Sequence, residues 1–512
     1  MQDTNWSQIE WELLSEEIEL SPPWKADHFF NTFCLDMDGI YKIQIWRDEE
    51  YMLRAKLIGN CVITDQGDEG ALERGVIVQS DLKGVWDYSY SAKLIQCFPE
   101  LATTNYLLQE DRTAVECTMG ISHIKVKPHK SLPKQKRESL VEWCLNAPTS
   151  TVLYVDSTER KVKTKLQKKR DMCEDSYIPN RQSQNSRDTV YIAFEKTGCY
   201  ISQVPEQYEP RWSGKLSIEY RKKFGYVPDK KTREAVRELA GFLMGRDLKL
   251  IGRTEYSKSG FAIRAMAQNP QSVNIVKVCR LCNQEIVPVH IYGNESLNFK
   301  ETMEQLLPRY LHSDMRDVIQ KTLPLYWSSF VLYVDNAIPV IASAIETLQK
   351  AWFALEENES VSVYYPKTKF RELKKDLIAI IDEKLEEGPY KNAVRNKVDQ
   401  LNQMSVRDKN ESFFAQLGIT YGEREIQAIR MRNVFAHGDT NGKTDAGNMI
   451  EAIKVLQLLY AKSVLKLLGY EGEYIDWCDG EREKRYIEYE LFKRYFFNCA
   501  SSASSSAIRE AC

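Results

Sequence analysis

The stretch IPVIASAIETLQKAWFAL, residues 338–355, sets the fold class of the second half of the chain. Its large apolar side chains recur every three or four residues, at Ile338, Ile341, Ile345, Leu348, Trp352 and Leu355. Because a helix turns once in about 3.6 residues, these side chains share one face, which predicts an amphipathic helix. The spacing recurs through Phe370, Leu373, Leu377 and Ile381, then through Val394, Val398 and Leu401. We interpret these faces as the ordinary core of a helix bundle beginning near residue 297.

Glycine and proline mark where the predicted helices stop. Gly388-Pro389 separates the second apolar face from the third, and Gly469 is placed to end the last helix. Further helices are expected over residues 423–437 and 449–468. The apolar surface from Ile450 to Leu468 is wider than one bundle face needs. Two interpretations stay open for that surplus: an interface with a second copy, or burial within the same chain.

Residues before about 297 follow the two-residue period of β-strands. Tyr41, Ile43 and Ile45 alternate with Lys42 and Gln44, and Leu53, Ala55 and Leu57 repeat the pattern. Further strands are expected at residues 76–78, 121–126, 152–155 and 190–194, and a helix near residues 232–244. The predicted fold class is therefore α+β and multidomain, with a β-rich N-terminal region followed by an all-α helix bundle.

These patterns divide the chain into three predicted parts. Residues 1–296 form the β-rich region, which we expect to sense or regulate, and a break near residues 157–188 would divide it into two subdomains. Residues 297–495 form the helix bundle. Residues 496–512 are rich in serine and alanine and are expected to be a low-complexity tail.

The composition is that of a soluble globular protein. Hydrophobic residues make up 43% of the 512 residues, and 70 basic against 73 acidic residues give a net charge of −3. This balance excludes a globally basic nucleic-acid coat but permits a local basic groove. Leu325–Ile345 is strongly apolar, yet it contains Asp335, Asn336 and Pro339, so it is predicted to be a buried helix rather than a membrane span.

The twelve cysteines lie at irregular spacing, and the first ten residues show no basic segment followed by an apolar run. We therefore expect reduced thiols, no secretory signal and a cytoplasmic location. Cys279 and Cys282 form a single C-x-x-C, whereas structural zinc needs four ligands. A pair of buried thiols is the preferred interpretation, with metal binding by this pair left open. No cofactor is expected.

Two basic stretches, Lys125–Arg137 and Arg160–Arg170, are candidates for electrostatic contact with RNA phosphates. The alternative interpretation is that both are solvated loops.

The residues that carry chemistry lie in RMRNVFAHGD, residues 430–439. On a helix, Asn433 and His437 are one turn apart, so the amide can fix the orientation of the imidazole. Arg432 is about 140° around an ideal helix from His437, so the two reach one phosphate only if the helix is distorted or ends here. Gly438 is well placed to end it.

These groups suit RNA cleavage by the 2′-hydroxyl. An imidazole titrates in the range needed for proton transfer. A guanidinium can hold phosphate oxygens in a bidentate fork and stabilise the phosphorane. The segment lacks the clustered carboxylates of a two-metal nuclease, so a metal-independent reaction is predicted. The candidate catalytic residues are Arg432, Asn433 and His437.

Arg432-Asn433-Val434-Phe435-Ala436-His437 resembles the R-N-x-x-x-H form of the HEPN motif, and its predicted place within a helix bundle is similar to that family. Gly438 and the upstream segment Lys369–Leu417, with Asn402-Gln403-Met404-Ser405, resemble the ApeA-like HEPN proteins of bacterial anti-phage defence. Those proteins carry a long N-terminal region before a C-terminal HEPN domain. The specific part of the resemblance covers roughly the last third of the chain.

The resemblance implies an endoribonuclease that acts on RNA, with tRNA or another structured RNA as candidate targets, in abortive infection. It also implies a phage-derived trigger and a homodimer joined through the HEPN domain. Since the motif supplies one imidazole, acid and base would come from one histidine acting twice or from two chains of a dimer. Two other functions stay open: a catalytically silent HEPN module for dimerisation and nucleotide binding, or a toxin controlled by a separate partner.

Overall fold

In the computed structural model of the chain, the described residues are 18–26, 40–60, 80–86, 90–107, 112–128, 135–148, 154–170, 173–204, 214–260, 262–270, 287–289, 299–355, 363–436, 446–472 and 474–478. The chain divides into two compact units. Unit 1 comprises Met1–Ile286 and Ile291–Pro308, and unit 2 comprises Val287–His290 and Arg309–Cys512. The domain boundaries expected at residues 296 and 495, and the break near residues 157–188, remain predictions.

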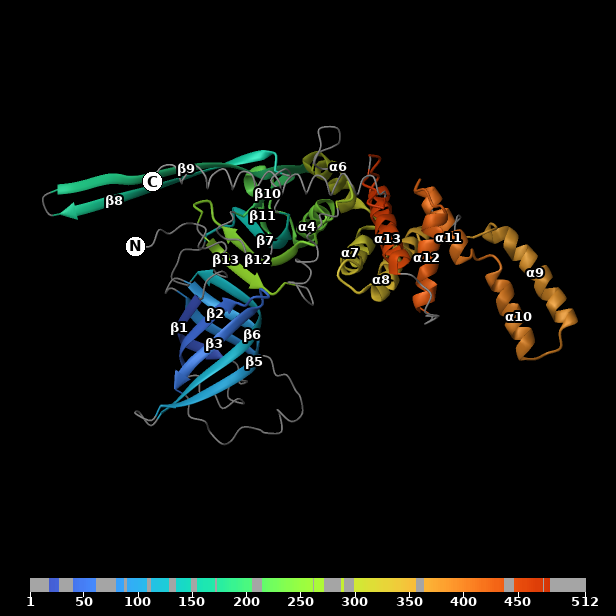
Figure 1. Ribbon diagram of the computed structural model, residues 1–512, viewed down its shortest axis with the longest axis horizontal. Helices are drawn as coiled ribbons and strands as arrows, with labels where there is room; N and C mark the ends of the chain where they lie inside the picture. Colours follow the sequence, from blue (N-terminus) through green and yellow to red (C-terminus); the bar gives the residue numbers. More distant parts are fainter. Residues whose placement is uncertain are drawn as a thin grey trace. The chain divides into compact units, whose positions relative to one another are not determined.

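Unit 1 is built on one antiparallel sheet, drawn from blue to green in Figure 1. Its described strands are β1 (Ile18–Ala26), β2 (Ile40–Arg47), β3 (Leu53–Asn60), β4 (Ser80–Trp86), β5 (Tyr90–Leu107), β6 (Arg112–Pro128), β7 (Ser139–Ala147), β8 (Asp156–Arg170), β9 (Cys173–Phe194), β10 (Thr197–Gln203), β11 (Gly214–Arg221), β12 (Lys249–Tyr256) and β13 (Ala262–Gln268). They lie in the order β3-β2-β1-β4-β5-β6-β13-β12-β7-β11-β10-β9-β8. Because β3 also pairs with β6, the first six strands close into a ring.

The apolar side of the ring forms a continuous core. Its buried side chains include Ile43, Ile45, Leu57, Leu94, Met119 and Ile124. The predicted alternation is right for Ile43 and Ile45 and wrong for Tyr41, whose exposed fraction is 58%. The pairing register with β3 shifts between Ile40 and Lys42, so Ile40 takes the buried position in place of Tyr41.

The other strand predictions have mixed outcomes. Residues 121–126 and 190–194 lie in β6 and β9, as predicted. Residues 76–78 and Cys279 and Cys282 fall outside the described residues. Tyr154 and Val155 precede β8 and are not in a strand, so that prediction is wrong where it can be compared. The basic stretch Arg160–Arg170 is part of β8, paired with β9, rather than a loop.

One helix of unit 1, α4 (Lys230–Met244), confirms the helix predicted near residues 232–244. The side chain of Asp229 accepts a hydrogen bond from the amide of Thr232 at 2.8 Å and so caps its first turn. The carboxylate of Glu142 on β7, with an exposed fraction of 3%, pairs with Arg233 at 2.8 Å and with Arg237 at 3.0 Å. This buried triad joins α4 to the centre of the sheet.

The second half of the chain is helical, which confirms the predicted class. After the short 3-10 helix η4 (Lys222–Phe224) of unit 1, the remaining described helices are α6 (Phe299–His312), α7 (Arg316–Ser328), α8 (Val334–Phe353), α9 (Lys367–Lys384), α10 (Pro389–Gln400), α11 (Val406–Gln416), α12 (Glu423–Ala436) and α13 (Ala446–Leu467). Helices α7, α8, α12 and α13 pack on one another, and α9 lies beside α10 as a hairpin (Figure 1). Gly469 ends α13 with φ of 70°, as predicted.

The apolar face that begins at Ile338 is the buried side of α8. Ile338, Ile341, Ile345, Leu348 and Trp352 are all buried. Leu325–Ile345 is not one helix, however, because α7 ends at Ser328 and α8 begins at Val334. None of the helices in the described ranges combines the length and apolar character that a membrane crossing requires.

Burial corrects one expectation about apolar faces and decides between two interpretations of another. The faces of α9 and α10 are not ordinary core, since Leu373, Val394 and Leu401 remain exposed. A hairpin of two helices covers only the inner side of each helix, which leaves the outer apolar side chains uncovered in the described part of the chain. Conversely, α13 is buried almost all round from Ala452 to Leu465. The apolar surplus of α13 is therefore accounted for within the same chain.

Candidate active site

The described part of the candidate motif, residues 432–436, lies in the last turns of α12. Two acidic residues in the first turn, Glu423 and Glu425, suit the positive end of the helix dipole. The Glu425 carboxylate accepts a hydrogen bond from the amide of Gly422 at 2.9 Å, which satisfies a donor at the start of the helix. The helix continues through Ala436, the residue before His437.

The burial pattern of α12 shows which way Arg432 points. Glu425 and Ala428 are buried, and Arg432, four residues after Ala428, lies on the same face. The opposite face carries exposed Gln427 and Arg430. The Arg432 side chain is 29% exposed, against 61% for Arg430. Arg432 is thus directed toward the packed side of α12 but is still reachable from solvent.

On that side, Arg432 meets a carboxylate from α8. Its Nη1 forms an ion pair with Oε1 of Glu346. The Nζ of Lys350, one turn further along α8, lies 3.9 Å from the other carboxylate oxygen of Glu346. A guanidinium has five N–H donors, so a pair with one carboxylate oxygen leaves donors that could contact a phosphate.

The register of α8 in the bundle is fixed close to Glu346. Gln349, three residues later, is buried, and its amide donates to Oδ1 of Asn410 on α11 at 2.7 Å. Between α7 and α13, the hydroxyl groups of Thr322 and Tyr460 form a hydrogen bond of 2.9 Å. Buried polar groups must find partners, so these bonds hold the helices in one alignment. That alignment presents Glu346 to Arg432.

Sequence reasoning did not single out Glu346. A signal was present, because Glu346 is the only acidic residue between Ile338 and Leu355. A lone carboxylate in an apolar helix needs a partner, yet the sequence does not say where that partner is. The fold supplies it from α12.

The other two predicted catalytic residues are less fully placed. Asn433 lies in α12 directly after Arg432. His437 lies outside the described residues, which resume at Ala446. The convergence of Arg432, Asn433 and His437 on one phosphate therefore remains a prediction.

Residues 340–474, from α8 to the segment after α13, match the family model described as Apea-like HEPN. This part of the chain is an ApeA-like HEPN domain. The HEPN domain includes both Glu346 and Arg432, and the resemblance inferred from the motif is confirmed for these residues. In comparisons with curated proteins and with solved structures, nothing matches the chain. The HEPN domain supports a defence-type function.

Proposed function

We propose that the chain is a metal-independent endoribonuclease of HEPN type that acts in the cytoplasm as an anti-phage effector by abortive infection. The observation that supports this proposal is the sequence Arg432-Asn433-Val434-Phe435-Ala436-His437 inside the HEPN domain, with residues 432–436 in α12. In this proposal residues 1–296 sense a phage-derived trigger or restrain the nuclease, residues 297–495 carry the nuclease, and residues 496–512 are a tail.

Each motif residue has a proposed role. The 2′-oxygen of RNA attacks phosphorus while a base removes its proton, and the bond from phosphorus to the 5′-oxygen breaks as that oxygen gains a proton. His437 moves protons in this reaction. Arg432 stabilises the charge that develops on the phosphorane, and Asn433 orients the imidazole. Attack by the internal hydroxyl requires no metal-bound water.

The products of cleavage test this mechanism. The full chain is incubated with RNA in EDTA, and the ends of the fragments are analysed. We expect 2′,3′-cyclic phosphate and 5′-hydroxyl ends, loss of cleavage in His437→Ala, and unchanged cleavage in the control His312→Ala on α6. Fragments with 5′-phosphate ends, formed only when divalent metal is present, would contradict the mechanism.

The ion pair of Arg432 supports a second candidate. A guanidinium partly neutralised by Glu346 contributes less positive charge to a transition state. The domain would then be a catalytically silent module for dimerisation and nucleotide binding. Wild-type protein that binds RNA or nucleotides but leaves RNA uncut under every condition tried, with or without a phage-derived trigger, would favour this candidate.

We also propose that the active species is a homodimer joined through the HEPN domain. Two copies of His437 near one cleft would supply both an acid and a base. The exposed apolar side chains of α9 and α10, among them Leu373, Ile380 and Val394, are candidates for part of the interface.

A further inference from the structure

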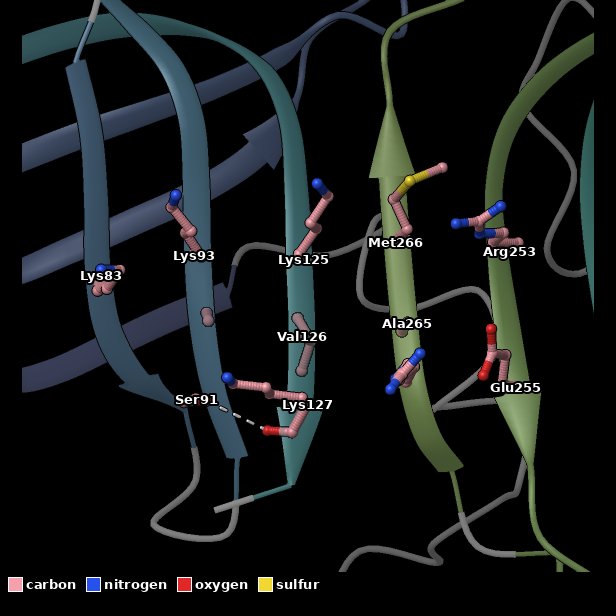
Figure 2. Close-up of a pocket in the computed structure, with 12 residues that line it drawn as sticks. Lys83, Ser91, Lys93, Lys125, Val126, Lys127, Arg253, Glu255, Ala265 and Met266 are labelled. Carbon is pink, nitrogen blue, oxygen red and sulfur yellow. Dashed lines mark hydrogen bonds between the residues drawn. The ribbon is translucent and has the colours of Figure 1, made fainter. Parts of the chain in front are cut away.

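A row of basic side chains crosses five neighbouring strands of unit 1. The pairing register places Lys83 of β4 opposite Lys93 of β5, and Lys93 opposite Lys125 of β6. It continues through Met266 of β13 to Arg253 of β12. Residues paired in register project from the same face of a sheet, so the four cations form a line. Figure 2 shows this line across the strands.

The line lies on the outer face of the sheet. On each strand its members alternate with buried side chains, such as Ala92 and Leu94 beside Lys93, and Ile124 and Val126 beside Lys125. Lys127 and Arg264 add two more cations on the same face, and together these residues line a hollow of about 450 Å³. We call Lys83, Lys93, Lys125 and Arg253 the basic row.

The protein neutralises the basic row only in part: the carboxylate of Asp81 interacts with Lys83, and Glu255, which lines the hollow, lies opposite Arg264 in the pairing register. Lys93 pairs with Asp81, but within the part of the chain that the structure describes, the other row members, Lys127 and Arg264 form no salt bridge. Elsewhere in the same sheet, cations do find carboxylates: Lys42 pairs with Glu19 at 2.9 Å and Lys56 with Glu116 at 2.6 Å. Like charges directly opposite one another on adjacent strands destabilise a sheet. The chain retains this unfavourable cluster of positive charges although its net charge is −3.

The shape of the row indicates its ligand. Neighbouring strands are about 4.8 Å apart, so four strand steps from Lys83 to Arg253 span roughly 19 Å. That is longer than the two or three phosphates of a nucleotide but suits the repeating phosphates of a nucleic-acid strand. Among the described residues that line the hollow there is no aromatic side chain, and the apolar side chain on the face of the row is Met266, since Ala92, Val126 and Ala265 face the core. This lining favours contact with the phosphate backbone over stacking with bases.

We propose that the basic row of unit 1 binds the phosphodiester backbone of single-stranded RNA without regard to sequence. The choice of RNA rests on the proposed ribonuclease function. The lysines act here as point charges, and the guanidinium of Arg253 can donate two hydrogen bonds to one phosphate. The site lies in unit 1 and uses none of the residues of the HEPN motif, so it gives the β-rich half of the chain a role in holding RNA.

Binding by the full chain tests the proposal, with a labelled 2′-O-methyl oligouridylate as the probe. This oligonucleotide has no free 2′-hydroxyl and cannot be cut by the proposed mechanism, so binding is read without cleavage. Each neutralised phosphate of a single strand contributes about −0.7 to the slope of log K against log salt. Four contacts then weaken binding about 50-fold between 50 and 200 mM salt.

The test variant is Lys83→Gln with Lys125→Gln and Arg253→Gln, which should flatten the salt slope by about 2. The control removes three exposed lysines of unit 1 outside the hollow, with Lys196→Gln, Lys222→Gln and Lys230→Gln, and should keep the wild-type slope. The charge-preserving variant Lys83→Arg, Lys125→Arg, Arg253→Lys should also keep it. Thermal melting is followed for every variant to confirm that unit 1 is folded.

Three results would overturn the proposal. The test variant could keep the wild-type affinity and slope, or the control could lose as much affinity as the test variant. The test variant could also lose binding of a nucleoside triphosphate while it still binds the oligonucleotide, which would make the row a small-ligand site. Cleavage of unmodified RNA is measured separately, so a protein that cuts no RNA but shows the expected slopes refutes the nuclease and not the row.

Discussion

Replacing Arg432 by alanine should remove most of the nuclease activity proposed for the HEPN domain. Arg432 is 29% exposed and stands on the packed side of α12, so its surroundings lie between water and the protein interior. With an effective dielectric constant of about 20, a unit charge about 4 Å from a developing negative charge contributes roughly 4 kcal/mol. Each 1.36 kcal/mol is a factor of ten in rate, so the upper limit of the loss is about 10³.

The ion pair with Glu346 reduces this upper limit. Part of the positive charge of Arg432 is already balanced by that carboxylate. We therefore expect kcat/KM to fall by about 10², the lower end of the range typical of a lost donor to a developing oxyanion. Stability should change little, because a partly exposed ion pair contributes about 0–1 kcal/mol.

The matched control is Arg430→Ala. Arg430 is two residues away on the exposed face of the same helix, and its side chain is 61% exposed. Its Nη1 lies 3.9 Å from Oε1 of Glu423. Cleavage of a labelled RNA is followed for wild type and both variants, together with thermal melting. A loss below about threefold for Arg432→Ala, or an equal loss for Arg430→Ala, would refute the assignment of Arg432 to phosphate stabilisation.

Glu346→Gln should lower the rate of RNA cleavage about tenfold and leave KM nearly unchanged, because Arg432 loses the carboxylate that orients it. Faster cleavage by this variant would show instead that Glu346 restrains Arg432. Glu142→Gln should lower the free energy of unfolding of unit 1, measured in urea, by about 3–5 kcal/mol, because buried Arg233 and half-buried Arg237 lose their partner. Glu234→Gln, on the more exposed side of α4, should cost under about 1 kcal/mol, and similar losses for the two variants would count against the role of Glu142. Burial raises the pKa of Cys478 to about 12, so the reactive thiolate is scarce at pH 8.5 and its fraction increases as the pH approaches 12. Iodoacetamide at pH 8.5 should therefore label Cys478 about 10³-fold faster when the protein is unfolded in urea, and equal labelling rates would contradict the burial of this thiol. Leu373→Glu should shift the proposed dimer toward monomer in light scattering and make specific activity fall on dilution, whereas a wild type that is monomeric and keeps its specific activity on dilution would exclude the dimer.

The predictions that held are those that depend on neighbours along the chain. The three-to-four-residue spacing from Ile338 to Trp352 is a local property, and the side chains that it places on one face are buried in α8. The helix expected from residue 423 and the end of α13 before Gly469 are local as well, the latter because glycine readily adopts the positive φ of a helix C-terminus. The motif beginning at Arg432 is also local, and the region around it matches the HEPN family.

The predictions that failed depend on what covers a surface. The apolar faces of α9 and α13 look alike in sequence, yet Leu373 is exposed and Leu456 is buried. Periodicity states that a face is apolar, but the number of neighbouring helices determines whether it is covered. Tyr41 failed for a related reason, since a shift in pairing with β3 reversed the face on which it lies.

The sequence by itself therefore determined the fold class, the helical and strand periods and the residues proposed for catalysis. Only the tertiary structure brought Glu346 on α8 to Arg432 on α12, because helix packing selects contacts between residues far apart in the chain. The same holds for the basic row. The sequence marked Lys125 as part of a basic stretch, but strand pairing alone aligned it with Lys83, Lys93 and Arg253. Register is set by long-range hydrogen bonding and by burial of one face, neither of which a local sequence pattern contains.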